Sequence, residues 1–221
     1  MILRTNIQSR KSIFCGLLLL AVGCWLLPTS LRAQETTNSR QARQLFDKTF
    51  QMVFGPQGST LHYAVNIIGI YKTEGTVWYK GRKLRYSEAR YASWNDGTTA
   101  YMIDHKKKTV GIYKANSDKK DKYLSKFKFK PSDYTYSWAA DKSGIVVSIK
   151  ANHFGLTGIR EVRAILDKTT HAPVSLRIKV SFFWTTVNIT HFKSGDIVDS
   201  TFVFPRDKFR SYEFSDHRND D

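Results

Sequence analysis

Residues 174–183 read Val-Ser-Leu-Arg-Ile-Lys-Val-Ser-Phe-Phe, and this stretch indicates the fold class. Apolar side chains take the even positions from Val174 to Phe182, and polar side chains take the odd positions from Ser175 to Ser181. Successive side chains of a strand point to opposite faces of its sheet, so this strand has one dry and one wet side. Such a strand is typical of an antiparallel sheet that covers a core with one face.

The period of two continues through most of the chain. Asn95-Asp96-Gly97 is a hairpin signal, because its turn positions need positive φ. Residues 186–209 are expected to form a strand, a turn at Ser194-Gly195 and a second strand that closes with Phe202-Val203-Phe204-Pro205. In all, the patterns predict about 10–11 antiparallel strands. They lie at 61–67, 74–79, 83–92, 98–104, 109–114, 135–139, 144–151, 158–167, 174–183, 185–192 and 196–204.

Two segments have helical character. Apolar residues at i, i+3, i+4 and i+7 from Ala42 onward predict an amphipathic helix over residues 40–54, with Ser39 as its N-cap. Gly55-Pro56 is expected to end it. A short second helix is expected at 121–129, where apolar residues follow a charged loop.

The first 33 residues have the pattern of an export signal. Arg4, Arg10 and Lys11 make a positive start, residues 13–27 are largely apolar, and Ala33 offers a small residue at a cleavage point. The apolar run is short for a membrane span. We therefore expect residues 1–33 to be a cleavable signal peptide, residues 34–221 to be one domain, and the mature protein to be periplasmic.

Both cysteines, Cys15 and Cys24, lie in this signal, so the mature chain would hold no thiol and no disulfide. Residues 20–24, Leu-Ala-Val-Gly-Cys, partly resemble a lipobox, in which the Cys is acylated after cleavage. Against this, Ala21 stands where Leu or Val is favoured, and apolar residues continue past Cys24. Soluble export is favoured, and lipid anchoring at Cys24 stays open.

The mature chain is strongly basic. Four of the 35 basic residues fall in the signal, which leaves 31 basic against 19 acidic residues and a net charge of +12. This charge fits an acidic partner or an anionic lipid surface, and it also fits a well-solvated surface without a partner. Nucleic acid is not expected as a partner, since no recognition motif is present.

Nothing in the sequence indicates catalysis or metal binding. The six histidines are scattered, and no pair has the i, i+4 spacing of a helical metal site. There is no Gly-x-Ser-x-Gly elbow and no P-loop. We therefore expect a protein that is not an enzyme and has no cofactor.

Several motifs together resemble the periplasmic outer-membrane lipoprotein carriers of the LolA type. Residues 75–80, Gly-Thr-Val-Trp-Tyr-Lys, look like the family's Gly-x-x-Trp-x-Lys strand, and residues 95–101 look like its Asp-Gly turn with the following aromatic strand. The expected closing hairpin and Asp216-His217-Arg218 look like the family's carboxyl end. The resemblance implies an α+β, mostly β fold. It would be an incomplete, half-open antiparallel β-barrel whose concave face is covered by the N-terminal helix and the short second helix.

The resemblance also implies a function and partners. A LolA-like carrier holds the acyl chains of lipoproteins in a hydrophobic cavity and hands them on towards the outer membrane. Its partners would be acylated lipoproteins, an inner-membrane lipoprotein-releasing complex and an outer-membrane acceptor, and it would act as a monomer. Burying acyl chains is favourable by roughly 0.8 kcal/mol per methylene, so a modest cavity suffices.

The expected cavity is formed by alternate residues of the strands, and the expected lid by the N-terminal helix with an Arg that pins it. Arg82 is the candidate for that Arg, one position later than the family's pattern places it. The lid residues are Leu45, Phe46, Phe50 and Arg82. The cavity residues are Leu61, Tyr63, Val65, Ile67, Trp78, Leu84, Tyr86, Ile178, Val180, Phe182, Val187, Ile189, Phe202 and Phe204.

Three alternatives remain. The same fold could serve as a membrane-anchored, LolB-like acceptor or as a sensor of mislocalised lipoproteins. The apolar residues could also pack together as a sealed core, since most buried apolar residues serve packing. The protein would then be a non-enzymatic adaptor that binds an acidic partner through basic loops such as residues 106–108 and 119–120.

Overall fold

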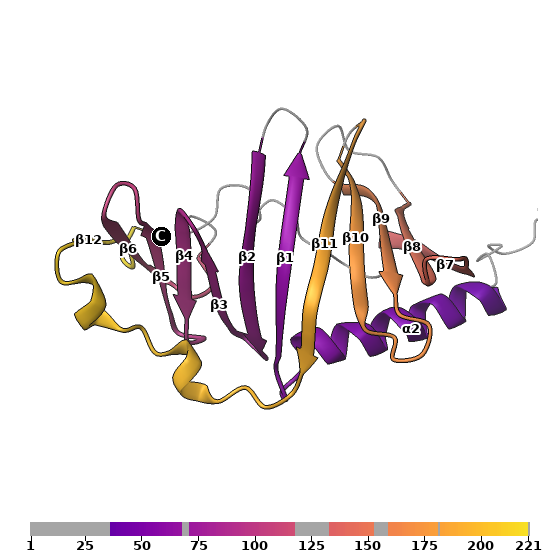
Figure 1. The fold of residues 1–221 in the computed structure, drawn as a ribbon, viewed down its shortest axis with the longest axis horizontal. Helices are drawn as coiled ribbons and strands as arrows, with labels where there is room; N and C mark the ends of the chain where they lie inside the picture. The colour runs from indigo at the N-terminus through magenta and orange to yellow at the C-terminus, as the bar shows by residue number, and fades with distance from the viewer. Residues whose placement is uncertain (1–35, 68–70, 118–132, 153–158, 181, 221) are drawn as a thin grey trace, which may run out of the picture. The chain divides into compact units, whose positions relative to one another are not determined.

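The computed structural model describes residues 36–67, 71–117, 133–152, 159–180 and 182–220. The expected signal, the lipobox and the expected helix at 121–129 lie outside these residues. The described part is mostly β: one 12-stranded sheet, an α-helix at its N-terminal side, and two 3-10 helices near the C-terminus (Figure 1). No helix of this described part is long and apolar enough to cross a membrane.

The strands follow the sequence patterns closely up to residue 194. The segment expected as one strand at 83–92 is two strands, β3 and β4, separated by Ala89 and Arg90. The bounds are β1 Ser59–Ile67, β2 Tyr71–Lys80, β3 Lys83–Glu88, β4 Tyr91–Asn95, β5 Thr99–Asp104, β6 Thr109–Lys114, β7 Tyr134–Ala140, β8 Ile145–Ala151, β9 Ile159–Leu166, β10 Pro173–Val180, β11 Phe183–Ser194 and β12 Glu213–Asp216.

The sheet is built from two meanders that meet at its centre. Its order is β12-β6-β5-β4-β3-β2-β1-β11-β10-β9-β8-β7, so that β1 lies between β2 and β11. All pairs are antiparallel except β12 with β6, which is parallel. The edge strands β12 and β7 are not paired with each other, and the sheet is therefore open.

The helix α2 (Thr37–Phe54) starts earlier than expected. Its N-cap is Thr36 instead of Ser39: the Thr36 hydroxyl accepts a hydrogen bond from the Ser39 N–H at 3.1 Å. Gly55 ends the helix as expected, and its N–H donates to the Gln51 carbonyl. A side-chain oxygen at the cap satisfies one of the unpaired N–H groups of the first turn, and Thr can supply it as well as Ser.

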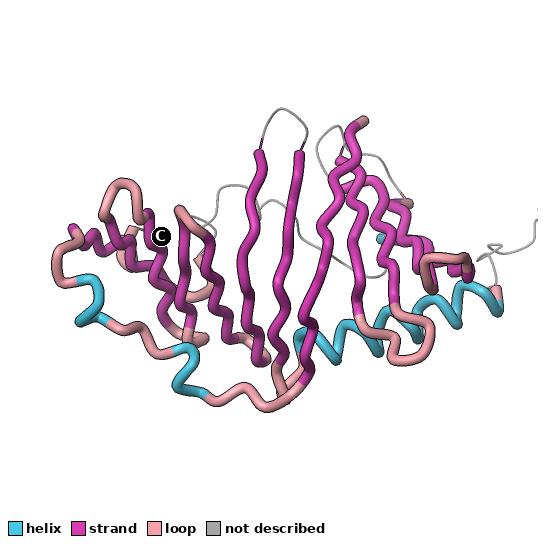
Figure 2. Tube along the Cα trace, viewed as in Figure 1, coloured by secondary structure: helices cyan, strands magenta, loops and turns pink. Residues whose placement is uncertain are grey.

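The predicted carboxyl-terminal hairpin is wrong. The chain leaves β11 at Gly195, and residues 195–212, which we call the strap, contain the 3-10 helices η5 (Asp199–Phe202) and η6 (Arg206–Phe209) instead of a strand (Figure 2). Because β11 already pairs with β1 on one side and β10 on the other, no free edge is left for residues 196–204. The strap instead passes the β1–β6 half of the sheet and delivers β12 to β6 (Figure 1).

The two faces of the sheet have separate covers. On the helix face, α2 packs on β7 and β8 through Ala42, which is fully buried against Val147 and Leu166. Its last turn reaches β1 and β2, where Val53 packs on Leu61 and Val77. On the opposite face, which we call the strap face, the cover of β4–β6 is aromatic and comes from the strap.

The edge strand β7 is capped by the helix. The Asn38 side-chain amide donates to the Trp138 carbonyl at 2.9 Å, and its oxygen accepts from the Trp138 N–H at 3.0 Å. One side chain thus imitates a neighbouring strand. Unpaired strand edges invite association with other chains, so this contact both fixes the start of α2 and protects β7.

Candidate functional site

The candidate site is the helix face of the sheet between α2 and β6. The registers decide which side chains share it: Leu61 lies opposite Val77, Val77 opposite Tyr86, and Tyr63 opposite Ile189. Side chains directly opposite each other point to the same face. Eight of the residues expected to line a cavity therefore share the helix face, namely Leu61, Tyr63, Val65, Leu84, Tyr86, Ile178, Val187 and Ile189.

Other residues of that expected set lie elsewhere. Trp78 is opposite Thr60 and Arg85 and so faces the strap side of the sheet. Phe204 belongs to the strap and stacks on Tyr101 with ring centroids 4.1 Å apart. Phe202 is buried in η5, next to β3, and Phe182 is 77% exposed beside the β10–β11 turn. The side chains of Ile67 and Val180 lie outside the described residues.

The expected lid residues form part of an aromatic row along α2. Ring centroids are 5.9 Å apart between Phe46 and Phe50, 4.7 Å between Phe50 and Phe54, and 4.6 Å between Phe54 and Tyr79 of β2. The i, i+4 spacing places these three Phe side chains on one side of the helix. Phe50 is 43% exposed and Phe54 36%, whereas Phe46 and Leu45 pack on the cluster beneath α2.

The helix is held in place along its length, so it is a fixed wall of the site in this structure. Thr49 donates to the His171 carbonyl at 3.2 Å, Ser59 donates to the Val53 carbonyl at 2.7 Å, and Ser194 donates to the Met52 carbonyl at 3.1 Å. The carbonyls near the end of a helix lack intrahelical partners, and these hydroxyls satisfy two of them.

Arg82 is exposed in the turn between β2 and β3. The same turn reaches the end of α2 through its backbone, because the Gly81 N–H donates to the Gly55 carbonyl at 3.2 Å. Arg82 thus stands close to the helix end that a lid-pinning residue would contact. Its role as that residue stays a prediction.

A polar pair interrupts the apolar helix face. The Tyr63 hydroxyl donates to Glu88 of β3, across the position of Gly75. A Cβ at Gly75 would stand 3.1 Å from the Tyr63 hydroxyl oxygen and 2.6 Å from the Ser87 carbonyl oxygen, so only Gly leaves room for this contact. Further along β2, burial raises the pKa of Tyr79 to about 12.

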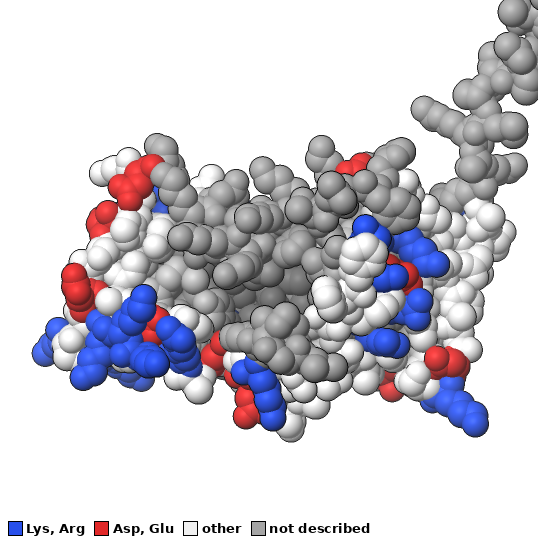
Figure 3. All heavy atoms as spheres, turned by 90° about the horizontal axis from the view of Figure 1, so that it is seen from above, with Lys and Arg blue, Asp and Glu red and all other residues white. Residues whose placement is uncertain are grey.

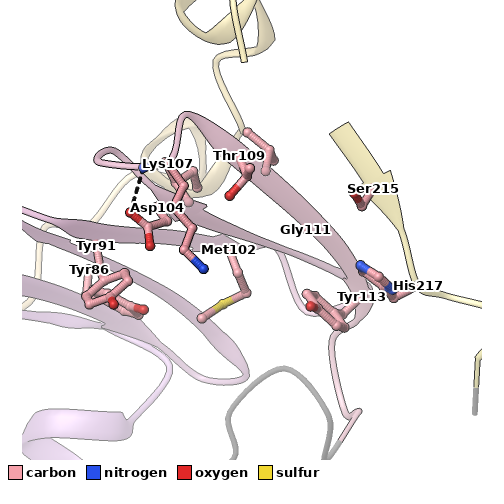
Figure 4. A pocket seen from close by; sticks show the side chains of 12 residues that line it. Tyr86, Tyr91, Met102, Asp104, Lys107, Thr109, Gly111, Tyr113, Ser215 and His217 are labelled. Carbon is pink, nitrogen blue, oxygen red and sulfur yellow. Dashed lines mark hydrogen bonds between the residues drawn. The ribbon is translucent and has the colours of Figure 1, made fainter. Parts of the chain in front are cut away.

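Beyond Tyr86 the helix face opens into a groove of about 370 Å³ over β4–β6 (Figure 4). Met102 forms part of its floor, and Gly111 keeps it open, because a Cβ there would meet the Tyr113 ring at 2.7 Å. Figure 4 shows Asp104 and Lys107 at one end, and Tyr113 and His217 at the other.

Asp104 and His217 of this groove both have polar partners. Burial raises the pKa of Asp104, but the Lys107 backbone N–H and the Arg90 guanidinium outweigh it, and the pKa lies below its usual value. At the other end His217 stacks on Tyr113 with centroids 4.9 Å apart, and its Nδ1 lies 2.8 Å from Asp220. The groove therefore combines apolar side chains with polar groups at its ends.

The sequence interpretation named Tyr86 among the residues of this groove and missed the others. Ala100, Met102 and Asp104 alternate on β5, and continuing the face assignment from Tyr86 across the Asn95-Asp96-Gly97 hairpin would have placed Met102 on the helix face. His217 had no such signal, because it reaches the groove through the parallel pairing of β12 with β6.

The structure offers no metal centre among the residues it describes: no three His, Cys, Asp or Glu side chains gather there. His62 and His191 approach each other with ring centroids 6.2 Å apart, beside the register shift between β1 and β11. His191 adopts a φ of 51° at this bulge. Close to it in the sequence, Asp196 pairs with Lys193 at 3.1 Å.

No protein-family model matches the sequence, and the comparison with curated proteins found no match. Among solved structures, an uncharacterized conserved protein from Thermus thermophilus aligns at 9% identity with a TM-score of 0.54, over 80% of this chain and 99% of the other. At this identity the alignment shows a common fold alone.

Two further solved structures align less closely. A DUF1329 family protein from Desulfovibrio piger has a TM-score of 0.41 at 10% identity, over 77% of this chain and 99% of its own. A LolA superfamily protein from Nitrosomonas europaea has a TM-score of 0.38 at 9% identity, over 75% and 98%. Scores under 0.5 add no argument of their own. The described residues form an open, mostly antiparallel sheet with an N-terminal helix packed on one face, and this agrees with the mostly β, half-open fold class expected from the sequence.

Proposed function

We propose that this protein is a periplasmic carrier that binds the acyl chains of lipoproteins on the helix face of its sheet. The observation that carries the proposal is the aromatic row of α2, whose Phe50 and Phe54 remain partly exposed beside an apolar sheet face. A solvent-exposed apolar surface next to a groove is typical of a binding site for a hydrophobic ligand.

The dimensions of the site favour a chain-like ligand over a compact one. The apolar strip runs across β10, β11, β1, β2 and β3, and the groove of about 370 Å³ continues from Tyr86 towards β6. An extended acyl chain can lie along such a strip and bury its methylene groups. Each buried methylene contributes roughly 0.8 kcal/mol to the free energy of binding. Affinity then comes from burial alone, and no catalytic group is required.

In this proposal the protein receives acylated lipoproteins from an inner-membrane releasing complex and passes them to an outer-membrane acceptor. The cargo has to be released again, so binding must be reversible. The Gly81–Gly55 contact ties the β2–β3 turn to the end of α2, and it is the contact whose opening would loosen that end of the wall.

The test uses protein recovered from the periplasm of an expressing bacterium, with its N-terminus read by mass spectrometry. Native mass spectrometry with an added triacylated lipopeptide is expected to show a one-to-one adduct. Phe50→Asp places a charge in the aromatic row and is expected to weaken binding by at least tenfold, since one partly buried aromatic contact is worth about 1.5 kcal/mol or more.

The matched control is Val203→Asp, which adds the same charge at an apolar residue that is 65% exposed on the strap. It is expected to leave lipopeptide binding unchanged. Failure of the unaltered protein to bind any acyl ligand would overturn the proposal and favour a sealed-core adaptor. An equal loss of lipopeptide binding in both variants would show that the ligand does not bind on the helix face.

A further inference from the structure

A second candidate surface lies at the turn between β10 and β11. The turn between β10 and β11, together with the start of β11, carries three consecutive aromatic residues, Phe182, Phe183 and Trp184. Phe182 is 77% exposed and Phe183 is 73% exposed. Two neighbouring aromatic residues with side chains this exposed are uncommon on a surface that has no partner. They indicate a site where the protein contacts another apolar surface.

Cations surround these aromatic residues. The Trp184 ring lies within cation–π distance of three of them: Arg163 at 4.9 Å, Arg177 at 5.1 Å and the Lys179 ammonium at 5.6 Å from its centroid. The Arg160 guanidinium lies 5.0 Å from the centroid of Phe182. We call the seven residues Arg160, Arg163, Arg177, Lys179, Phe182, Phe183 and Trp184 the tip patch.

The registers show why the cations gather there. Lys179 pairs with Trp184 and Arg177 with Arg163, so these four side chains share the strap face of β9, β10 and β11. Glu161 is opposite Lys179 on the same face, but its carboxylate is already paired with Arg163 at 2.6 Å. The patch therefore keeps a positive excess.

The wider surface has the same sign. Viewed from above Figure 1, Lys and Arg side chains lie over the half of the sheet that contains β7–β11 and also, in a larger group, over the opposite half (Figure 3). The sequence as a whole carries 35 basic and 19 acidic residues. A positive field over the patch would attract an anionic surface before any aromatic contact forms.

The geometry points to the tip patch as a docking surface for an anionic lipid bilayer. Trp and Phe side chains settle in the interfacial zone of a membrane, and neighbouring Arg and Lys bind the lipid phosphates. The cation–π contacts hold the basic groups around the aromatic rings. The basic groups can therefore bind lipid phosphates while the rings enter the apolar edge of the bilayer. An acidic protein would use the same cations but would have no need of two exposed Phe side chains at a turn.

This inference does not rest on the proposed acyl-binding function. A lipid drawn into the helix face would depend on neither the charge of the vesicle nor Phe182. Binding through the tip patch depends on both. The two ideas can therefore fail separately in a single assay.

The assay is flotation of the periplasmic protein with vesicles of phosphatidylcholine, with or without phosphatidylglycerol as roughly one third of the lipid. The protein is expected to float with the anionic vesicles and to stay behind with the neutral ones. Arg177→Gln with Lys179→Gln is expected to lower the affinity at least tenfold, at about fivefold per cation. Phe182→Ser with Phe183→Ser is expected to lower it by a similar factor, because both rings leave water on binding.

Two matched controls come from exposed positions away from the patch. Lys106→Gln with Lys142→Gln removes the same charge, and Val198→Ser with Val203→Ser removes apolar side chains that are 63% and 65% exposed. Each pair is expected to change the affinity less than the corresponding patch variant. Thermal melts of all variants confirm that they fold.

Two results would overturn the inference. The first is a protein that does not float with anionic vesicles, or that floats equally well after either patch substitution. The second is a protein whose capture of acidic proteins is lost in the cation variant and kept in the Phe variant, with no vesicle binding. That outcome would assign the patch to an acidic macromolecule.

Discussion

The helix α2 and the strap cover opposite faces of the sheet, and they are held there by different kinds of side chain. Under α2 the cluster is mostly aliphatic, with Val147, Ile149 and Leu166 almost fully buried. Under the strap the cluster is aromatic: the ring centroid of Trp94 lies 5.8 Å from that of Phe204 and 5.7 Å from that of Phe209. A regular helix satisfies most of its own backbone hydrogen bonds, whereas the irregular strap is held by the burial of large aromatic side chains.

The fastening differs as well. The helix is tied by side-chain hydrogen bonds to backbone groups, such as those of Asn38 and Thr49. The strap begins with ion pairs, in which Lys80 and Lys83 reach Asp199 at 2.9 and 3.0 Å, and Lys80 also donates to the Ile197 carbonyl at 2.8 Å. The comparison predicts that the strap depends on aromatic burial and the helix on directed hydrogen bonds.

The largest expected effect is that of Phe209→Ala, which removes the centre of the aromatic cover. The loss of stability should be about 3–5 kcal/mol, as for other buried Phe side chains. Hydrogen exchange should then be faster at β12 and directly after it, for example at the His217 N–H that donates to the Ile112 carbonyl, and unchanged in α2. Val203→Ala, at an exposed position of the strap, should cost less than about 0.5 kcal/mol. Equal acceleration in α2 and β12 would show that the two covers unfold as one.

Asn38→Ala should have an intermediate effect. It removes both hydrogen bonds to Trp138 of β7, which together should cost about 1–3 kcal/mol. The exposed helix position Gln44→Ala is the control and should be nearly neutral. Chemical denaturation measures both, and exchange should rise at the start of α2 and in β7. An Asn38→Ala protein as stable as the control would mean that packing alone fastens the helix.

The smallest effect is expected from the ion pairs of the strap. Hydrogen bonds from Lys80 and Lys83 hold the pKa of Asp199 below its usual value of 3.8. A lowered carboxyl pKa contributes stability above the unfolded value, and this contribution is lost as the pH falls below about 3.8. Asp199→Asn should therefore lower the melting temperature slightly at neutral pH and not in acid, since the carboxylate is exposed to solvent. A loss of the same size at both pH values would point to packing of η5 instead of charge.

Much of the fold could be predicted from local patterns. Ten of the eleven segments expected as strands contain strand, because alternation along Val174–Val180 or Thr99–Asp104 reports the two faces of a sheet directly. The amphipathic spacing from Ala42 to Val53 predicted α2 for the same reason, with Ala42 fully buried. The split at Ala89–Arg90 has no comparable local signal.

The site was predicted only where it follows from alternation. Leu61, Tyr63 and Val65 had to share a face once β1 was a strand. Trp78 was expected in the cavity set, but it is one residue out of phase with Val77 and Tyr79 and faces the other side of the sheet. The groove at Tyr113 and His217 joins strands that are far apart in the sequence, and no pattern within either strand reveals that meeting.

The sequence by itself determined the mostly β class, the helix at its start, the turns at Asn95–Gly97, and which residues along each strand share a face. These follow from steric preferences of single residues and from side-chain periods, which act over a few positions. The tertiary structure alone decided that the sheet stays open, that the strap forms 3-10 helices and that β12 runs parallel to β6. Those outcomes depend on which strand edges are already occupied. Both edges of β11 are paired, so the residues after Gly195 could not add a strand beside it. They pack on the sheet through their aromatic side chains instead.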